Sequence, residues 1–134
     1  MAVQDKKNSN NQTINFSAKV PEKTPNFYLY LFTVNHKTAP VAIREKFSIP
    51  EYKLKDATNE LKNYKSLDSF LILSTCNRTE IYFTSTNFEN AISDIYSFLS
   101  KFLNLEEKVV KEYNSLLTNP NVVEHTFKLA CGLD

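Results

Sequence analysis

Runs of apolar residues alternate with polar stretches along the chain, and their rhythm predicts four strands. Residues 27–34 are almost continuously apolar, β-branched or aromatic, which is typical of a strand covered on both faces. Residues 70–73 and 81–84 are also strand-like, and only the polar stretch 74–80 separates them, so they are expected to pair as a hairpin. A shorter strand is predicted over residues 109–113.

Three other segments carry apolar residues at helical intervals. The first helix is predicted to begin at Ser48–Glu51, which has the spacing of a capping box, and to continue to Tyr64. The second begins at Asn87, an N-cap residue, and carries a wide apolar stripe to Phe102. The third begins at Asn119-Pro120, because proline is favoured at the first helical position.

The predicted order is therefore β-α-β-β-α-β-α. This order is typical of an α+β, ferredoxin-like split βαβ sandwich, in which an antiparallel sheet carries helices on one face, with a C-terminal helix added. The fold leaves the strand ends and the hairpin loop available for a site. Fold alone does not name a function.

The composition indicates one domain with a polar leader. At 134 residues and 42% hydrophobic content, the chain can form one compact core. Residues 1–26 are rich in Asn, Lys, Ser and Gln, and we expect a disordered leader or an expression remnant there. Residues 27–118 form the predicted ferredoxin-like domain, and residues 119–134 begin a helix that leads out of it.

Charge, targeting signals and glycine content exclude several function classes. The net charge of +1 gives no general attraction to nucleic acid or membranes. The N-terminus lacks the apolar region of a signal peptide, and FYLYLF is too short to span a bilayer, so we expect a soluble protein. Two cysteines without a disulfide framework are typical of a reducing compartment, so we expect a cytoplasmic location. With Gly132 as the single glycine, no loop for nucleotide phosphates is predicted.

The two cysteines, Cys76 and Cys131, form no CxxC pair, so neither a metal site nor a disulfide framework is expected. Cys131 falls at the apolar end of the last helix and is expected to pack there. Cys76 is either a small packed residue at a strand end or a nucleophile. Its polar neighbours favour the nucleophile, because the guanidinium of nearby Arg78 would stabilise the thiolate.

Two further residues have alternative interpretations. Arg78 and Glu80 can be explained simply as a surface ion pair, which would contribute about 0 to 1 kcal/mol. His125, on the last predicted helix, is either a partly buried structural histidine or a base or proton donor near Cys76. Spacing alone does not decide between these interpretations.

Three blocks of the sequence resemble the glutamyl-tRNA reductase family, and together they extend over about residues 28–134. They are NHKTAPV at residues 35–41 with Arg44-Glu45 following, STCNRTEIY at residues 74–82, and HTFKLACGLD at residues 125–134. Thr33-Val34, Thr126 and Cys131 depart from the residues that the family commonly has. We expect these departures to affect packing more than chemistry.

The resemblance implies a reaction for Cys76. In that family the corresponding cysteine attacks the ester between glutamate and its tRNA, and hydride from NADPH reduces the resulting thioester to glutamate-1-semialdehyde, a precursor of tetrapyrroles such as haem. A thiol suits this step, because it is nucleophilic near neutral pH and its thioester accepts hydride more readily than the ester does. Cys76 is therefore the predicted catalytic nucleophile.

The resemblance also implies roles for five other residues. Arg78 would hold the glutamate carboxylate, which a planar guanidinium can bind through two hydrogen bonds. Thr75 and Asn77 would supply further hydrogen bonds, and His36 would contribute to substrate binding. His125 would act as a catalytic residue that orients the substrate or handles a proton.

The family's enzyme is longer, with an NADPH-binding domain and a helical dimerisation domain, so the resemblance implies an excised catalytic domain. The expected partners are glutamyl-tRNA and the downstream glutamate-1-semialdehyde aminotransferase. The full-length enzyme is expected to be a homodimer and this fragment a monomer. An alternative of another class is a non-catalytic tRNA- or protein-binding module that kept the fold, although the near-neutral charge weakens its tRNA version.

Overall fold

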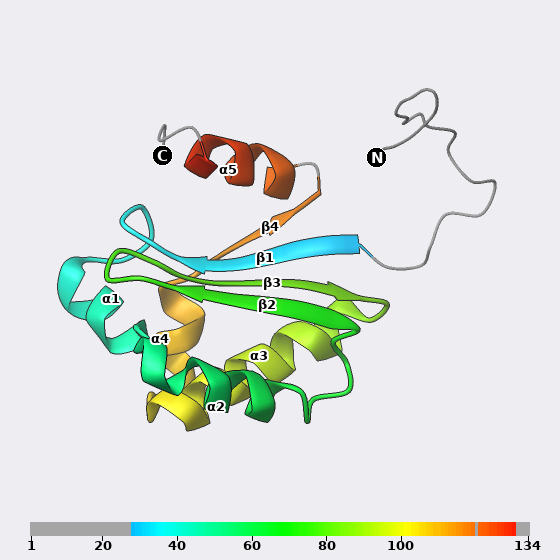
Figure 1. The fold of residues 1–134 in the computed structure, drawn as a ribbon, viewed down its shortest axis with the longest axis horizontal. Coiled ribbons are helices and arrows are strands. Elements are labelled where there is room, and N and C mark those ends of the chain that lie inside the picture. The colour runs from blue at the N-terminus through cyan, green and yellow to red at the C-terminus, as the bar shows by residue number, and fades with distance from the viewer. Residues whose placement is uncertain (1–27, 120, 131–134) are drawn as a thin grey trace.

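A computed structural model of the chain describes residues 28–119 and 121–130 (Figure 1). Its elements are β1 Tyr28–Val34, α1 Val41–Phe47, α2 Glu51–Leu61, β2 Ser69–Ser74, β3 Thr79–Ser85, α3 Phe88–Leu103, α4 Glu107–Glu112, β4 Ser115–Thr118 and α5 Asn121–Ala130. The predicted α+β order is confirmed, with α1 and α4 as short helices that the sequence pattern did not predict. The predicted leader over residues 1–26 lies outside the described residues.

The four strands form one antiparallel sheet in the order β2-β3-β1-β4. β1 lies in the middle, where Leu31 is opposite Tyr82 of β3 on one side and Leu117 of β4 on the other. β2 and β3 pair as the predicted hairpin, with Ser74 opposite Thr79 next to the turn. The ferredoxin-like arrangement is thus present, because β3 lies between β1 and β2, and β1 lies between β3 and β4.

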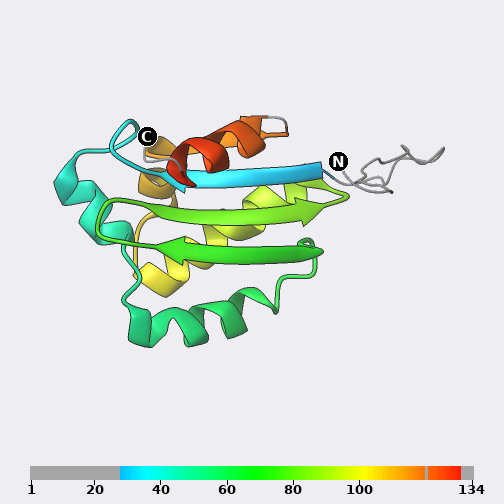
Figure 2. The same cartoon turned by 45° about the horizontal axis from the view of Figure 1, so that its top comes forward.

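The two faces of this sheet are covered differently. Helices α1 to α4 lie on one face, and α5 lies on the opposite face, against β1 and β4 (Figures 1 and 2). The hydrophobic core fills the first face, where the fully buried ring of Phe32 meets Tyr96 of α3 edge to face at 6.4 Å. Because side chains alternate along a strand, neighbouring Thr33 points to the face that α5 covers.

The strand predicted over residues 109–113 is wrong. Those residues belong to α4 and its C-terminal end, and the fourth strand is Ser115–Thr118. Two adjacent valines favour a strand, but the charged residues around them suit a helix that buries Val110 against α3. Lys111 and Glu107, one turn apart, form an ion pair at 3.7 Å on the exposed side of this helix.

The predicted helix ends have mixed outcomes. The capping box predicted at Ser48 is wrong. Ser48 is the C-cap of α1, where its N–H bonds to the Glu45 carbonyl. The N-cap of α2 is Pro50, and no side chain caps that helix end. The cap at Asn87 is confirmed, because its Oδ1 accepts the Asn90 N–H at 3.1 Å. The cap predicted at Asn119-Pro120 includes a residue outside those that the structure describes.

Candidate functional site

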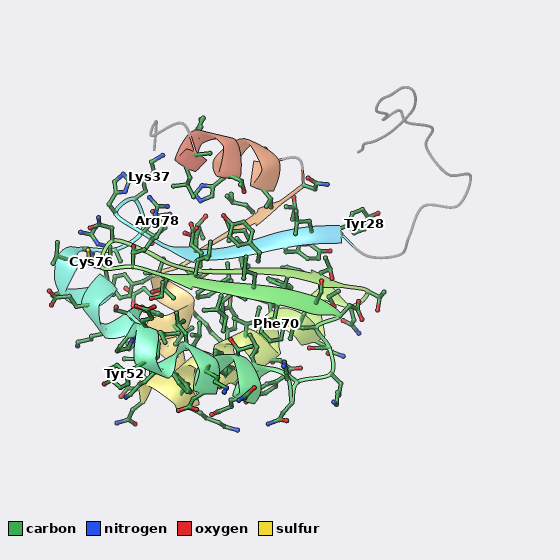
Figure 3. All side chains as sticks on the ribbon, viewed as in Figure 1. Tyr28, Lys37, Tyr52, Phe70, Cys76 and Arg78 are labelled. Carbon is green, nitrogen blue, oxygen red and sulfur yellow. The ribbon has the colours of Figure 1, made fainter. Side chains whose placement is uncertain are left out.

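The predicted nucleophile lies at the tip of the β2–β3 hairpin. The Thr75 N–H donates to the Arg78 carbonyl at 2.8 Å, and the Thr75 hydroxyl oxygen accepts the N–H groups of Asn77 and Arg78 at 3.2 and 3.3 Å. These bonds hold a tight turn in which Cys76 is a free, exposed cysteine. Cys76 and Arg78 lie at the same end of the sheet as Lys37 (Figure 3).

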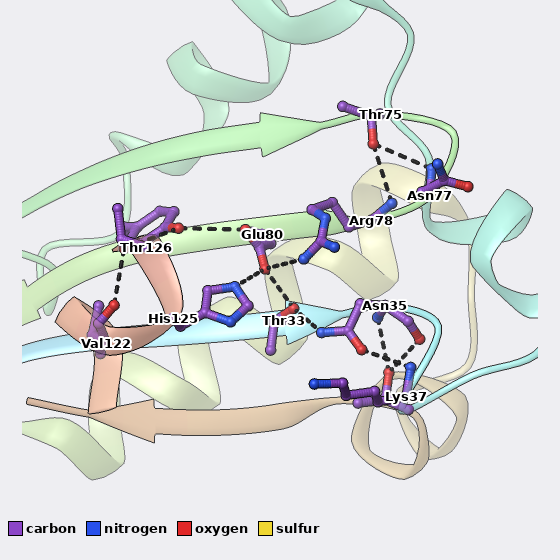
Figure 4. Close-up of polar contacts among 12 residues, drawn as sticks. Thr33, Asn35, Lys37, Thr75, Asn77, Arg78, Glu80, Val122, His125 and Thr126 are labelled. Atoms are coloured by element: carbon purple, nitrogen blue, oxygen red, sulfur yellow. Dashed lines mark hydrogen bonds and ion pairs between the residues drawn. The ribbon is translucent and has the colours of Figure 1, made fainter. Parts of the chain in front are cut away.

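A buried carboxylate, Glu80, lies on the strand that follows this turn. Its Oε2 atom accepts hydrogen bonds from Thr33 Oγ1 at 2.8 Å, from His125 Nε2 at 2.8 Å and from Arg78 Nη1 at 3.3 Å (Figure 4). Tyr82 donates to the other oxygen, Oε1, at 3.4 Å. The carboxylate therefore joins side chains from β1, β3 and α5 in one cluster.

This geometry corrects the interpretation of Arg78 and Glu80 as a surface ion pair. The ion pair exists, but the Glu80 side chain is 0% exposed and the Arg78 side chain only 15%. Burying a carboxylate is costly unless charged and polar partners compensate for the lost hydration. The Thr33 and His125 bonds supply that compensation, so the pair belongs to an organised site.

His125 joins this cluster from α5, and its side chain is 11% exposed. The hydrogen bond to Glu80 fixes the orientation of its ring, with Nε2 towards the carboxylate. The structure thus brings His125 together with Arg78 through Glu80. Among the described residues, no hydrogen bond joins the Cys76 thiol to His125, and the role of His125 as a base or proton donor near Cys76 stays a prediction.

The first sequence block contributes Asn35 to the cluster, and the substrate-binding role predicted for His36 stays a prediction. Asn35 is 5% exposed, and its Nδ2 donates to Thr33 Oγ1 at 2.8 Å. Its Oδ1 accepts the Lys37 N–H at 2.8 Å, and its own N–H donates to Thr38 Oγ1 at 3.0 Å. His36 is exposed in this turn and lies outside the hydrogen-bonded cluster that the described residues form.

Thr33 is one of the residues that depart from the family pattern, and it contacts Glu80. The Thr33-Val34 pair was expected to affect packing more than chemistry. The Thr33 hydroxyl bonds directly to Glu80, so Thr33 also belongs to the hydrogen-bonded cluster. Residue spacing could not reveal this contact, because it joins two strands that are 47 positions apart in sequence.

Tyr82 completes the cluster on the β3 side. Burial raises the pKa of its phenol above 10.0 and the nearby Glu80 carboxylate raises it further, although the hydrogen bond with Thr126 and the charge of Arg78 act in the opposite direction. The phenol therefore keeps its proton at neutral pH and remains a donor to Glu80. The sequence pattern singled out neither Tyr82 nor the Thr126 hydroxyl, which lies 3.5 Å from it.

A small hollow opens beside the cluster. Its volume is about 170 Å³, and its lining residues come from β1, the turn after it, β4 and α5: Thr33, Asn35, Lys37, Thr38, Ser115, Leu117 and His125. A hollow of this volume has room for several water molecules.

Neither a membrane-spanning helix nor a cluster of metal-ligating side chains occurs among residues 28–119 and 121–130. None of the helices in the described ranges has the length and apolar character needed to cross a membrane. Nor do three or more His, Cys, Asp or Glu side chains gather in these ranges so that they could hold a metal ion.

Fold and site together define an α+β domain that carries an exposed thiol next to a buried arginine–carboxylate–histidine cluster. The family model described as "Glutamyl-tRNAGlu reductase, N-terminal domain" matches residues 32–134. The chain therefore belongs to the glutamyl-tRNA reductase family, as the sequence blocks predicted.

Individual relatives agree with this assignment. The chain is 42% identical over 107 residues to glutamyl-tRNA reductase of Carboxydothermus hydrogenoformans, a match that covers 80% of this chain and 24% of the relative. It is 40% identical over 101 residues to the Microcystis aeruginosa protein of the same name, covering 75% of this chain and 24% of that protein. The chain thus spans about a quarter of the length of the curated relatives it matches.

A solved structure supports the fold. Glutamyl-tRNA reductase from Methanopyrus kandleri aligns with a TM-score of 0.53 at 20% identity, covering 78% of this chain and 22% of that one. At this identity the likeness is evidence for the ferredoxin-like fold only.

Proposed function

We propose that this chain is the substrate-binding, thioester-forming domain of a glutamyl-tRNA reductase, which converts glutamyl-tRNA to glutamate-1-semialdehyde with NADPH in tetrapyrrole biosynthesis. One observation carries the proposal: an exposed thiol, Cys76, lies two residues from Arg78, whose guanidinium the buried Glu80 holds. A glutamyl ester offers a carbonyl carbon to the thiol and a side-chain carboxylate to the guanidinium. The two groups match the two ends of that substrate.

In the proposed step, the Cys76 thiolate attacks the ester carbonyl carbon. A carbon–sulfur bond forms, and the bond from that carbon to the terminal ribose oxygen of the tRNA breaks. The ribose oxygen takes up a proton from water, which balances the proton that the thiol released to water when it formed the thiolate. Thr75 and Asn77 flank the thiol in the hairpin turn, where the Thr75 hydroxyl and the Asn77 side chain can bond to the substrate. The glutamyl group remains on Cys76 as a thioester.

Arg78 would hold the substrate carboxylate while the thiol reacts. A guanidinium has five N–H donors, and the bond from Nη1 to Glu80 does not by itself exhaust them. Glu80 holds the Nη1 end of the guanidinium, and His125 holds Glu80 from the α5 side. In this proposal His125 orients the substrate site through Glu80 and does not act as the base for Cys76.

The residues of this chain do not fit NADPH. Dinucleotide phosphates are held by glycine-rich turns between a strand and a helix of a parallel sheet. This chain has one glycine, and its sheet is antiparallel. Hydride transfer is therefore assigned to the full-length reductase, and the acylation step to this chain.

The other predictions that come from the family stay predictions for the full-length enzyme. They are the homodimer, the aminotransferase partner and the cytoplasmic location.

The proposal predicts that the chain alone releases glutamate slowly from glutamyl-tRNA, since water can hydrolyse the thioester. The assay follows loss of radiolabelled glutamate from the tRNA, with and without NADPH. We expect hydrolysis that Cys76→Ser abolishes, without NADPH consumption. Equal hydrolysis by wild type and Cys76→Ser would contradict the proposal, and binding of tRNA without any hydrolysis would favour the non-catalytic module.

A further inference from the structure

The hydrogen bonds at Glu80 continue beyond the cluster to the turn after β1. Thr33 Oγ1 donates to Glu80 and accepts from Asn35 Nδ2, both at 2.8 Å. Thr33 is 2% exposed and Asn35 5%, so water does not compete with these bonds. Neither residue takes part in the acylation step proposed above.

The donor and the acceptor of each hydrogen bond from Asn35 through Thr33 to Glu80 are fixed. The Asn35 Oδ1 atom accepts the Lys37 N–H, so Nδ2 is the atom that faces Thr33. An amide nitrogen can only donate, and therefore the Thr33 hydroxyl must accept from it. The single hydroxyl proton of Thr33 is consequently directed to Glu80 Oε2.

We infer that Thr33 and Asn35 are positioning residues for the carboxylate-binding arginine. They hold Glu80 Oε2 in place, and that oxygen in turn fixes Arg78 Nη1 and His125 Nε2. The inference rests on the proposed function for the identity of the substrate. The hydrogen-bond chain itself is independent of that identity and can be tested without any substrate.

The same series of hydrogen bonds links the turn after β1 to the substrate site. Asn35 holds the turn through its bonds with Lys37 and Thr38, and both of those residues line the hollow beside His125. A change in the turn that rotates the Asn35 amide would release the Thr33 proton from Glu80. The turn and the arginine are therefore expected to change together.

Three variants separate this role from a general structural one. Thr33→Val removes the hydroxyl at nearly constant shape in a strand that tolerates valine. Thr33→Ser keeps the hydroxyl and is the conservative rescue. Asn35→Asp keeps the acceptor for the Lys37 N–H but replaces the donor that faces Thr33 with a second acceptor, which draws the Thr33 proton away from Glu80.

A matched control is available on the same face of the sheet. Thr84 Oγ1 and Ser69 Oγ are 2.6 Å apart, in a hydroxyl pair separate from the Glu80 hydrogen bonds. Thr84→Val therefore also removes one hydroxyl hydrogen bond from this face. Circular dichroism confirms that each variant is folded before it is compared.

The first readout is nitrogen-15 NMR of the free protein, which reports the His125 ring and the Arg78 guanidinium. We expect both signals to move in Thr33→Val and Asn35→Asp and to stay close to wild type in Thr33→Ser and Thr84→Val. The second readout is KM for glutamyl-tRNA in the Cys76-dependent hydrolysis. We expect a rise of about tenfold in the first two variants, the factor that corresponds to about 1.4 kcal/mol, with a smaller change in kcat.

Each result has one meaning. Unchanged His125 and Arg78 signals in Thr33→Val would overturn the hydrogen-bond chain. Changed signals with an unchanged KM would overturn its role in positioning the arginine for substrate. Absence of hydrolysis by the wild type would instead overturn the proposed function, and the NMR comparison would still decide whether Thr33 and Asn35 hold Glu80.

Discussion

Replacing Glu80 with glutamine tests how the buried cluster is held together. The substitution keeps the size and one acceptor oxygen of the side chain, but it removes the charge that balances Arg78. The wild-type carboxylate is fully buried and accepts hydrogen bonds from Thr33, Arg78, His125 and Tyr82. Glu80→Gln therefore removes the Glu80 charge from beside a largely buried guanidinium.

The expected cost can be estimated from these contacts. A hydrogen bond to a charged group contributes about 1.5 to 3 kcal/mol, and removal of one partner from a buried ion pair costs about 3 to 5 kcal/mol. Because the amide oxygen still accepts part of the network, we expect Glu80→Gln to lower the free energy of unfolding by roughly 2 to 4 kcal/mol. That loss is a large fraction of the stability of an ordinary domain.

Urea unfolding followed by far-ultraviolet circular dichroism at neutral pH measures this loss. Glu107→Gln is the matched control, because Glu107 pairs with Lys111 at 3.7 Å while 48% of its side chain remains exposed. An exposed pair of this kind contributes about 0.3 to 0.5 kcal/mol. If Glu80→Gln costs no more than Glu107→Gln, the reasoning about the buried cluster is refuted.

Three further predictions concern other parts of the molecule. Because the folded protein raises the pKa of Tyr82, the stability that the protonated phenol contributes is fully present below pH 10.0 and is lost as the pH rises through the folded-state pKa. Above pH 10.0, urea unfolding should therefore show a smaller loss of stability for Tyr82→Phe than for the wild type. Equal losses in the two proteins would contradict this. Iodoacetamide at neutral pH should label the exposed Cys76 quickly, and mass spectrometry of Cys76→Ser should show that the fast phase is gone; a retained fast phase would assign it elsewhere. Asn87→Ala should lower the free energy of unfolding in urea by about 1 kcal/mol because α3 loses its cap, whereas an unchanged value would show that the bond to Asn90 is dispensable.

The sequence pattern predicted the parts of the fold that local periodicity determines. β1, the β2–β3 hairpin and α3 are long or strongly patterned, and their positions agree closely with the structure. The short segments α1, α4 and β4 were missed or misplaced. In α1 and α4 a few apolar residues stand next to charged ones, and β4 has only two leucines between polar residues. The structure of such a segment depends on its packing partners, and Val110 of α4, for example, packs against α3.

The candidate site was predicted only in part, for a related reason. Sequence blocks identified Arg78 and His125, which the structure brings together. They did not show that Glu80 joins these residues, because that requires α5 to cover the sheet face on which Glu80 lies. One signal was available: Ile81 and Phe83 point to the core, so strand alternation puts Glu80 and Tyr82 on the opposite face.

The central claim is that Cys76 takes the glutamyl group from glutamyl-tRNA. Peptide mass spectrometry after a short incubation with glutamyl-tRNA and an acid quench, which preserves thioesters, measures this directly. The account predicts a glutamyl adduct on the peptide that contains Cys76, lost on treatment with hydroxylamine and absent in Cys76→Ser. A folded wild-type chain that carries no adduct on Cys76, or that carries it on another residue, would contradict the account.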